Sequence, residues 1–208
     1  MTFGKDTTSL LFSSEECPFG YSWQYWVTKW WQWFLSIPVD NNPAVDLTGD
    51  KSSVKQNNPY VWFLAGTIYG RAERIVKIPA GKGLLLPIIN MTVSKNENPE
   101  LNSDTEMISY VEGHMKDIVK KRAIIDGNDV LVSEKFRVQS PPFYFNFPLN
   151  NIYNAQPGPG RGVGDGYWIF MKPPSSGIHT IKTYGSCMAG KIKIDVAIKL
   201  IIGQNPGK

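Results

Sequence analysis

The feature that most constrains this fold is a run of large aromatic residues near the N-terminus, SWQYWVTKWWQWFLSIP. Ser22 can serve as an N-cap and Pro38 ends the run, so the pattern predicts a helix over residues 22–36. Its indoles recur at steps of three and four residues, at Trp23, Trp26, Trp30 and Trp33. Such a helix is amphipathic, and its apolar stripe is mostly tryptophan.

Three interpretations of this tryptophan stripe are open. As part of a core, each indole would fill a gap between helix and sheet and bury about 150–250 Å². Exposed indoles would instead stack on sugar rings, or lie at the headgroup depth of a membrane. Lys29 is the only cation on the polar face, which disfavours the membrane, and we take the core as the first interpretation. Trp31 lies about 100° around the helix from Trp30, so we predict that it is partly exposed.

Turns divide the rest of the chain into short segments. The 208 residues include 19 Gly and 15 Pro, which favours strands and turns over long helices. An apolar stripe from Met107 to Val119 predicts one further helix, residues 104–121. About nine or ten strand-like segments predict a single, mainly β domain over residues 1–208. We expect an antiparallel β-sandwich, jelly-roll or immunoglobulin-like, with two accessory α-helices.

Shorter segments carry local signals. AIIDGND predicts a strand and a hairpin turn at Asp126-Gly127, and Pro87 within an apolar run predicts an edge strand or a bulge. The glycine-rich stretch PGPGRGVGDG lacks the Lys-Ser/Thr ending of a phosphate-binding loop, so we expect a mobile loop. The alternation in KIKIDVAIKLII predicts a strand with one wet and one buried face.

Three segments together resemble one family: WWQWFLSIP with DLTG downstream, VWFLAGT before IPAGK, and DGYW before PPSSGIHTI. From about Gly20 to Ile202 the chain is similar to an uncharacterised family of bacterial and archaeal proteins with a Trp-rich N-terminal segment. The resemblance implies a fold of β-strands, implies export for many members, and brings no activity or catalytic residues. We expect relatives to carry cysteines near Ser52 and Ile75, where this chain has none, which weakens the transfer of an extracellular location.

Charge and cysteine content exclude several partners. The net charge is +4, but no basic stripe with interleaved aromatic residues appears, so we predict no nucleic-acid partner. No apolar run approaches the ~20 residues of a transmembrane segment, and residues 10–12 are too short a patch for a signal peptide. We therefore expect a cytoplasmic protein, or an exported one if a leader has been removed. Cys17 and Cys187 are expected to be free thiols, and the two histidines lack metal-binding spacing, so we predict no metal and no cofactor.

The candidate site residues are aromatic or charged and lie in or beside predicted strands. They are Trp62, Glu73, Arg74, Asp165, Tyr167, Trp168 and His179. Glu73 between two arginines indicates a salt-bridge ladder, and Asp165 in a turn would accept backbone N–H groups. We expect His179 to contact a neighbouring backbone carbonyl.

Three functions are compatible with these residues. The leading hypothesis is non-enzymatic binding of a small molecule or glycan through aromatic residues. The first alternative is an enzyme with a pocket lined by Trp62, Glu73, Arg74 and Trp168. The second is a self-assembling structural subunit, and the oligomeric state stays open. An enzyme needs a concave pocket with perturbed titratable groups, whereas a binding protein needs only an aromatic surface.

Overall fold

The computed structural model describes residues 10–68, 70–188 and 191–204, mainly as β-strands in two sheets. The first nine residues of the predicted domain lie outside the described residues. Sheet A has the order β1 (Val61–Phe63), β3 (Gly83–Ser94), β7 (Gly158–Met171) and β6 (Phe143–Phe147). Sheet B has the order β2 (Arg71–Ile78), β9 (Ile192–Ile202), β8 (Gly177–Cys187), β4 (Ile118–Ile125) and β5 (Asn128–Val130).

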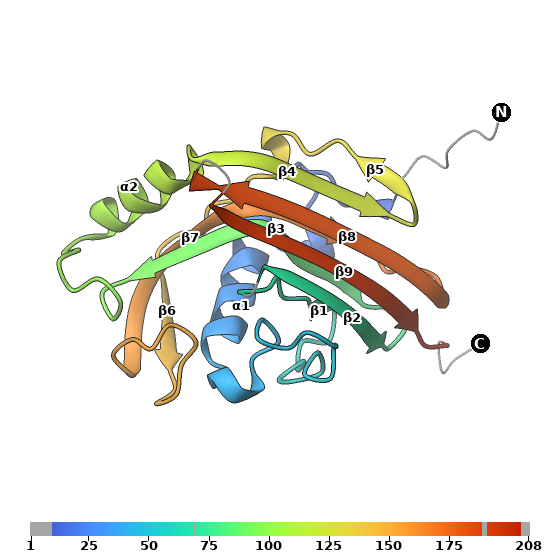
Figure 1. Ribbon diagram of the computed structural model, residues 1–208, viewed down its shortest axis with the longest axis horizontal. Helices are drawn as coiled ribbons and strands as arrows, with labels where there is room; N and C mark the ends of the chain where they lie inside the picture. The colour runs from blue at the N-terminus through green and yellow to red at the C-terminus, as the bar shows by residue number, and fades with distance from the viewer. Residues whose placement is uncertain (1–9, 69, 189–190, 205–208) are drawn as a thin grey trace.

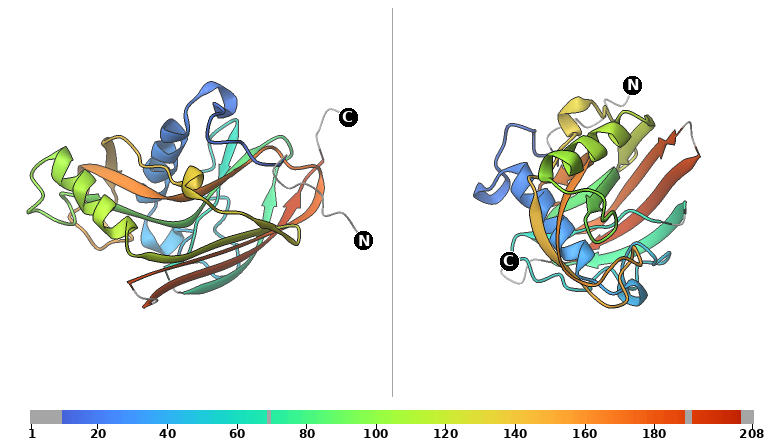
Figure 2. Two further views of the ribbon diagram at one scale, coloured as in Figure 1. Left: turned by 90° about the horizontal axis from the view of Figure 1, so that it is seen from above. Right: turned by 90° about the vertical axis from the view of Figure 1, so that its left-hand side faces the viewer.

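These elements form three layers, because α1 (Trp23–Leu35) covers one face of sheet A and sheet B covers the other (Figure 1). The left view of Figure 2 shows the blue helix above sheet A, with the red strands of sheet B below. Trp168 and Phe170 of β7 belong to the cluster under α1, whereas Tyr167 and Ile169 belong to the cluster between the sheets. Alternate residues of one strand thus enter two different cores.

Helix α1 confirms the core interpretation of the tryptophan stripe. Ser22 caps the helix by accepting a hydrogen bond from the Tyr25 amide. Three buried indoles donate to backbone carbonyls: Trp26 to Pro18 (2.7 Å), Trp30 to Leu64 (2.9 Å) and Trp33 to Val54 (2.9 Å). Each of these indoles therefore buries a large apolar surface without leaving its N–H group unsatisfied.

The prediction of a partly exposed Trp31 is wrong, since only 1% of its surface is exposed. A β-carbon added to Gly164 of β7 would lie 2.1 Å from Trp31 Nε1. The missing side chain at Gly164 is therefore what lets this indole lie against the strand. Trp31 also stands edge to face against Trp30 and Trp168. The buried face of α1 is consequently wider than the single stripe of indoles predicted from the sequence.

The second predicted helix ends earlier than its apolar stripe. Helix α2 (Asp104–Met115) begins with a capping box of Ser103 and Glu106, but Ile118 already starts β4. The prediction of a helix over 104–121 is therefore wrong in its last part, where residues 118–121 pair with β8. Ile118 and Val119 are β-branched, and β8 supplies partners for their backbone groups.

The glycine-rich stretch predicted as a mobile loop is the first part of β7, so that prediction is wrong. Its glycines allow close approach: a β-carbon at Gly160 would lie 2.5 Å from the Phe145 ring. A β-carbon at Gly166 would lie 2.5 Å from the β-carbon of Asn90 on the neighbouring strand. Glycine in this segment therefore indicates dense packing and not mobility.

The sheets are mixed, which corrects the wholly antiparallel prediction. β1 pairs in parallel with β3, and β2 pairs in parallel with β9. After β1 the chain crosses to sheet B, where it forms β2. It then returns to sheet A as β3, which runs parallel to β1. Two local predictions are confirmed: the turn at Asp126-Gly127 joins β4 to β5, and the register shifts just after Pro87.

Candidate functional site

The candidate residues proposed from sequence lie at separate places and do not share one pocket. Trp62 belongs to the cluster between the two sheets. Trp168 belongs to the cluster on the opposite face of sheet A, where its Nε1 donates to the Val138 carbonyl at 3.2 Å. Since sheet A separates the two indoles, they do not line a common pocket.

Arg74 and Glu73 point to opposite faces of β2. The Arg74 guanidinium is buried and donates to the carbonyls of Asp46, Ala65 and Gly66 at 2.6–2.9 Å. Burial lowers the pKa of Arg74 to about 10. Glu73 faces solvent and pairs with Arg71, so only one arginine of the predicted ladder contacts it. Arg74 ties two loops to the sheet, which is a structural role.

His179 lies near the start of β8, two strands across sheet B from Arg74 and two residues further along. Its Nδ1 contacts Asp126 Oδ2 at 2.7 Å, and its Nε2 contacts the Ser175 carbonyl at 3.0 Å. The predicted contact with a backbone carbonyl is confirmed. The ring links the β4–β5 turn to the segment before β8, so this histidine positions two connections.

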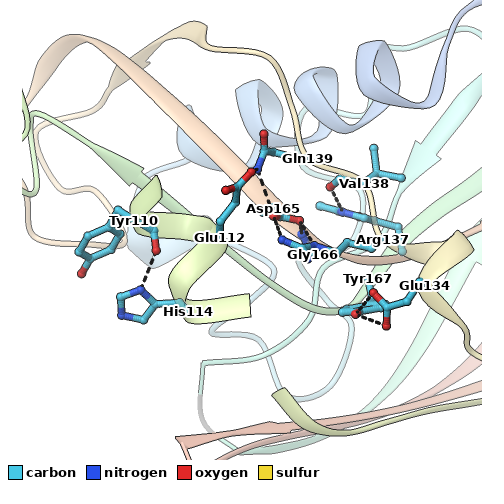
Figure 3. Close-up of polar contacts among 11 residues, drawn as sticks. Tyr110, Glu112, His114, Glu134, Arg137, Val138, Gln139, Asp165, Gly166 and Tyr167 are labelled. Carbon is cyan, nitrogen blue, oxygen red and sulfur yellow. Dashed lines mark hydrogen bonds and ion pairs between the residues drawn. The ribbon is translucent and has the colours of Figure 1, made fainter. Parts of the chain in front are cut away.

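Asp165 and Tyr167 are the candidate residues that the structure brings together (Figure 3). Asp165 lies within β7 and not in a turn, which corrects the sequence prediction. It borders an open cleft of about 380 Å³ between α2 and η4 (Glu134–Phe136), here called the Asp165 cleft. The other lining residues are Glu112, Lys116, Glu134, Arg137 and Gln139.

The carboxylates of Asp165 and Glu134 are already engaged by protein groups. Arg137 Nη2 donates to the fully buried Asp165 carboxylate at 2.7 Å, and the Gly166 amide donates to it at 2.7 Å. Tyr167 donates to Glu134 at 2.7 Å, and this hydrogen bond lowers the pKa of Glu134. A buried, hydrogen-bonded ion pair of this kind fixes the segment after η4 onto β7. The charged residues of the Asp165 cleft therefore have mainly a structural role, since they bond to one another.

A second cavity, which the sequence analysis missed, lies beside α1 and the middle of β3. We call it the Trp31 cavity; its volume is about 240 Å³. Aromatic and aliphatic side chains form most of its wall, including Trp30, Trp31, Phe34, Tyr153 and Ile194. These residues come from segments far apart in the chain, so no local motif could have revealed the cavity.

Two buried N–H donors on residues that line the Trp31 cavity lack a hydrogen-bond partner. They are Trp31 Nε1 and Asn90 Nδ2. A buried donor left unsatisfied costs about 1–3 kcal/mol, and such groups are rare in folded proteins. The hydroxyl groups of Thr92 and Tyr153, which also line the cavity, are paired, since Thr92 Oγ1 donates to Tyr153 Oη at 3.2 Å. Trp31 and Asn90 therefore each carry an unsatisfied donor in the wall of the cavity, and Trp31 Nε1 lies on the side of its indole that faces Gly164.

A titratable carboxyl group lies close to this cavity. Glu97 follows β3, and its Oε2 accepts a hydrogen bond from Ser94 Oγ at 2.7 Å. Burial raises the pKa of Glu97 to about 7. Burial and the charge of Glu97 together raise the pKa of Tyr153, a cavity residue, well above its ordinary range. The Trp31 cavity therefore has a buried acid beside one of its wall residues.

Two sequence predictions concern cysteines and metals. Cys17 and Cys187 are free thiols, as predicted. In residues 10–68, 70–188 and 191–204, no group of three His, Cys, Asp or Glu side chains could hold a metal ion. No helix in these same ranges is long and apolar enough to cross a membrane.

Comparison with known proteins assigns no family to this chain. No family model matches it, and no curated protein matches it. Among solved structures, the solution structure of amebosin aligns with 70% of this chain and 100% of its own, at 8% identity and a TM-score of 0.25. A likeness this low carries no argument about fold or function.

Proposed function

We propose that this protein binds a small, mainly apolar molecule with a hydrogen-bond acceptor in the Trp31 cavity. The observation that carries this proposal is the pair of unpartnered donors, Trp31 Nε1 and Asn90 Nδ2, on residues of an aromatic-walled cavity. Ligand sites are typically apolar with a few polar groups that fix orientation. An acceptor on the ligand would satisfy a donor, while its apolar body would contact Trp30 and Phe34.

The size of the cavity narrows the ligand class. A cavity of about 150 Å³ holds benzene, and drug-sized ligands need about 300–1,000 Å³. At about 240 Å³, the Trp31 cavity fits one aromatic ring with a short substituent. A carbonyl on that substituent would provide the acceptor.

Burial of the tryptophans favours such a molecule over a glycan. All seven tryptophans are at most 7% exposed, so none presents an open indole face to a sugar ring. The jelly-roll or immunoglobulin-like topology, the family resemblance and the cytoplasmic location stay predictions. Binding in the Trp31 cavity depends on none of them.

The test uses two compounds of nearly equal shape, acetophenone and isopropylbenzene, with calorimetry and thermal unfolding as readouts. Both should raise the Tm, because both bind only the folded state. Acetophenone should bind about two- to tenfold more tightly, since one net hydrogen bond contributes about 0.5–1.5 kcal/mol. The proposal would be contradicted if neither compound bound to the protein.

Two variants locate the binding site. A β-carbon at Gly66 would lie 3.7 Å from Pro87 and 4.0 Å from Ile194, so Gly66→Leu should fill the cavity and abolish binding. Gly113→Leu on α2, where no atom lies within 4 Å of such a carbon, is the matched control and should bind normally. Asn90→Leu should remove the preference for acetophenone and raise the Tm of the free protein. A lowered Tm would mean that water already satisfies this amide.

A further inference from the structure

The outer face of sheet B is the part of the molecule that this proposed function does not use. We define it as the alternate positions of β2, β9, β8, β4 and β5 whose side chains point away from sheet A. Figure 2 (left) shows no described element over this face. Strand pairing fixes its rows: Glu73 lies beside Ala197, and Ala197 lies beside Lys182.

This outer face carries a concentrated positive charge. Five exposed lysines lie on it, namely Lys77, Lys120, Lys182, Lys193 and Lys199. Within the part of the chain that the structure describes, none of the five forms an ion pair. Aligned on neighbouring strands of one rigid sheet, they form an electrostatic surface and not scattered solvated charges.

Carboxylates offset only part of this charge. Two arginines of the face are paired, Arg71 with Glu73 and Arg122 with Asp129, and Asp195 is the third acid. Seven cations against three carboxylates leave an excess equal to the net charge of the whole chain, +4. The remaining residues are therefore neutral in sum, and the formal charge of the protein is concentrated on one face.

The same face has an apolar hollow. A depression of about 350 Å³ lies over Ala197, with Ile75, Lys182 and Lys199 among the residues around it. Ile75 is 56% exposed and gives the hollow an aliphatic wall. The short side chain of Ala197 between longer neighbours leaves room for one apolar group of a partner.

We propose that the outer face of sheet B docks an acidic protein segment that places an apolar side chain in this hollow. A second copy of the chain is a poor occupant, because two faces with the same excess charge repel one another. A nucleic acid or an anionic membrane presents uniform negative charge, which Glu73 and Asp195 would oppose. A protein segment can place carboxylates on the lysines and an apolar residue over Ala197.

The dimensions suit a transient complex. Five strands span about 24 Å, and eight residues of β2 span about 26 Å, so the face offers about 600 Å². That area is at the lower limit for specific protein–protein interfaces. We therefore expect a micromolar Kd that rises as salt screens the charges.

The test measures binding of a fluorescent decapeptide of alternating Glu and Leu to the full chain by anisotropy. Lys182→Glu/Lys199→Glu should weaken binding at least tenfold. The matched control Lys95→Glu/Lys135→Glu makes the same charge change at exposed sites off this face and should change binding less than twofold. Ala197→Trp fills the hollow without changing charge and should also weaken binding.

Two results would overturn the proposal. The first is no binding of the peptide by the unmodified chain, and the second is equal loss in both double variants. If the peptide does not bind, lysine-dependent sedimentation with phosphatidylserine vesicles would identify a membrane as the partner of this face, and retention by single-stranded DNA would identify a nucleic acid. Thermal unfolding of every variant confirms that the chain is folded, since all four substituted lysines are exposed.

Discussion

Sheets A and B differ in how many of their faces are buried, and the sequence of each strand reflects this. The strands β3 and β7 of sheet A contain long, nearly continuous buried runs. By contrast, β2 of sheet B alternates strictly between exposed and buried residues. A strand covered on both faces needs apolar or small residues at every position, whereas a strand with one wet face needs them at every second position. The burial pattern along a strand therefore indicates whether its sheet is covered on both faces or on one.

The two sheets also separate two kinds of candidate interaction. The Trp31 cavity, with its unpartnered donors, lies among mostly buried residues beside sheet A. The lysine-rich outer face lies on the wet side of sheet B. Desolvation strengthens polar contacts in the first region, while solvent and salt weaken them in the second. Affinity in the cavity should therefore depend little on salt.

The largest expected difference between the regions is in stability. Trp26→Ala, Trp30→Ala and Trp31→Ala should each lower the free energy of unfolding by about 3–5 kcal/mol, because each leaves a cavity under α1. Against a typical total of about 5–15 kcal/mol, each loss would be large. Chemical denaturation measures it. A mild effect of Trp31→Ala alone would indicate that its neighbours collapse into the space.

The next largest effect is a pH dependence of the stability, caused by Glu97, which follows β3 of sheet A. The pKa of Glu97 is raised to about 7, so the folded chain binds more protons than the unfolded chain between about pH 4.5 and 7. Stability from this group is complete below about pH 4.5 and is lost as the pH rises to 7, by about 1–3 kcal/mol. Denaturation at several pH values should show the loss. Glu97→Gln should remove it, and the exposed Glu100→Gln should not.

The smallest effect is expected on the outer face of sheet B. Ile75→Ala should change the free energy of unfolding by less than about 1 kcal/mol, because half of this side chain is already in solvent. Its inward neighbour Val76 is 1% exposed, and Val76→Ala should cost more. Equal losses for both would mean that the outer face is covered in solution, which would favour self-association.

Local sequence signals predicted the elements whose backbone partners are close in the chain. Ser22 and the indole spacing located α1 because caps and helical periodicity are properties of neighbouring residues. The Asp-Gly turn located the β4–β5 hairpin for the same reason. The signal failed at residues 118–121, where an apolar stripe typical of a helix is overridden by pairing with β8. Long-range pairing cannot be read from a local window.

The candidate sites could be predicted least. Asp165 and Tyr167 were named from sequence, but their partners Arg137 and Glu134 lie some thirty residues earlier and were missed. The Trp31 cavity is formed by residues of α1, β3, β9 and three loops, and its energetic cost is visible only in the two buried donors that lack partners. A cavity of this kind forms only when the helix and the two sheets have packed together.

By itself, the sequence determined the class of the fold: a mainly β chain with one tryptophan-rich amphipathic helix and a C-terminal strand with one wet face. Those properties follow from composition, caps and periodicity, which act over a few residues. Only the tertiary structure decided that Gly164 makes room for Trp31, that the charge of the chain gathers on sheet B, and where the cavity lies. Each of these depends on which distant segments become neighbours, and that is set by packing all three layers at once.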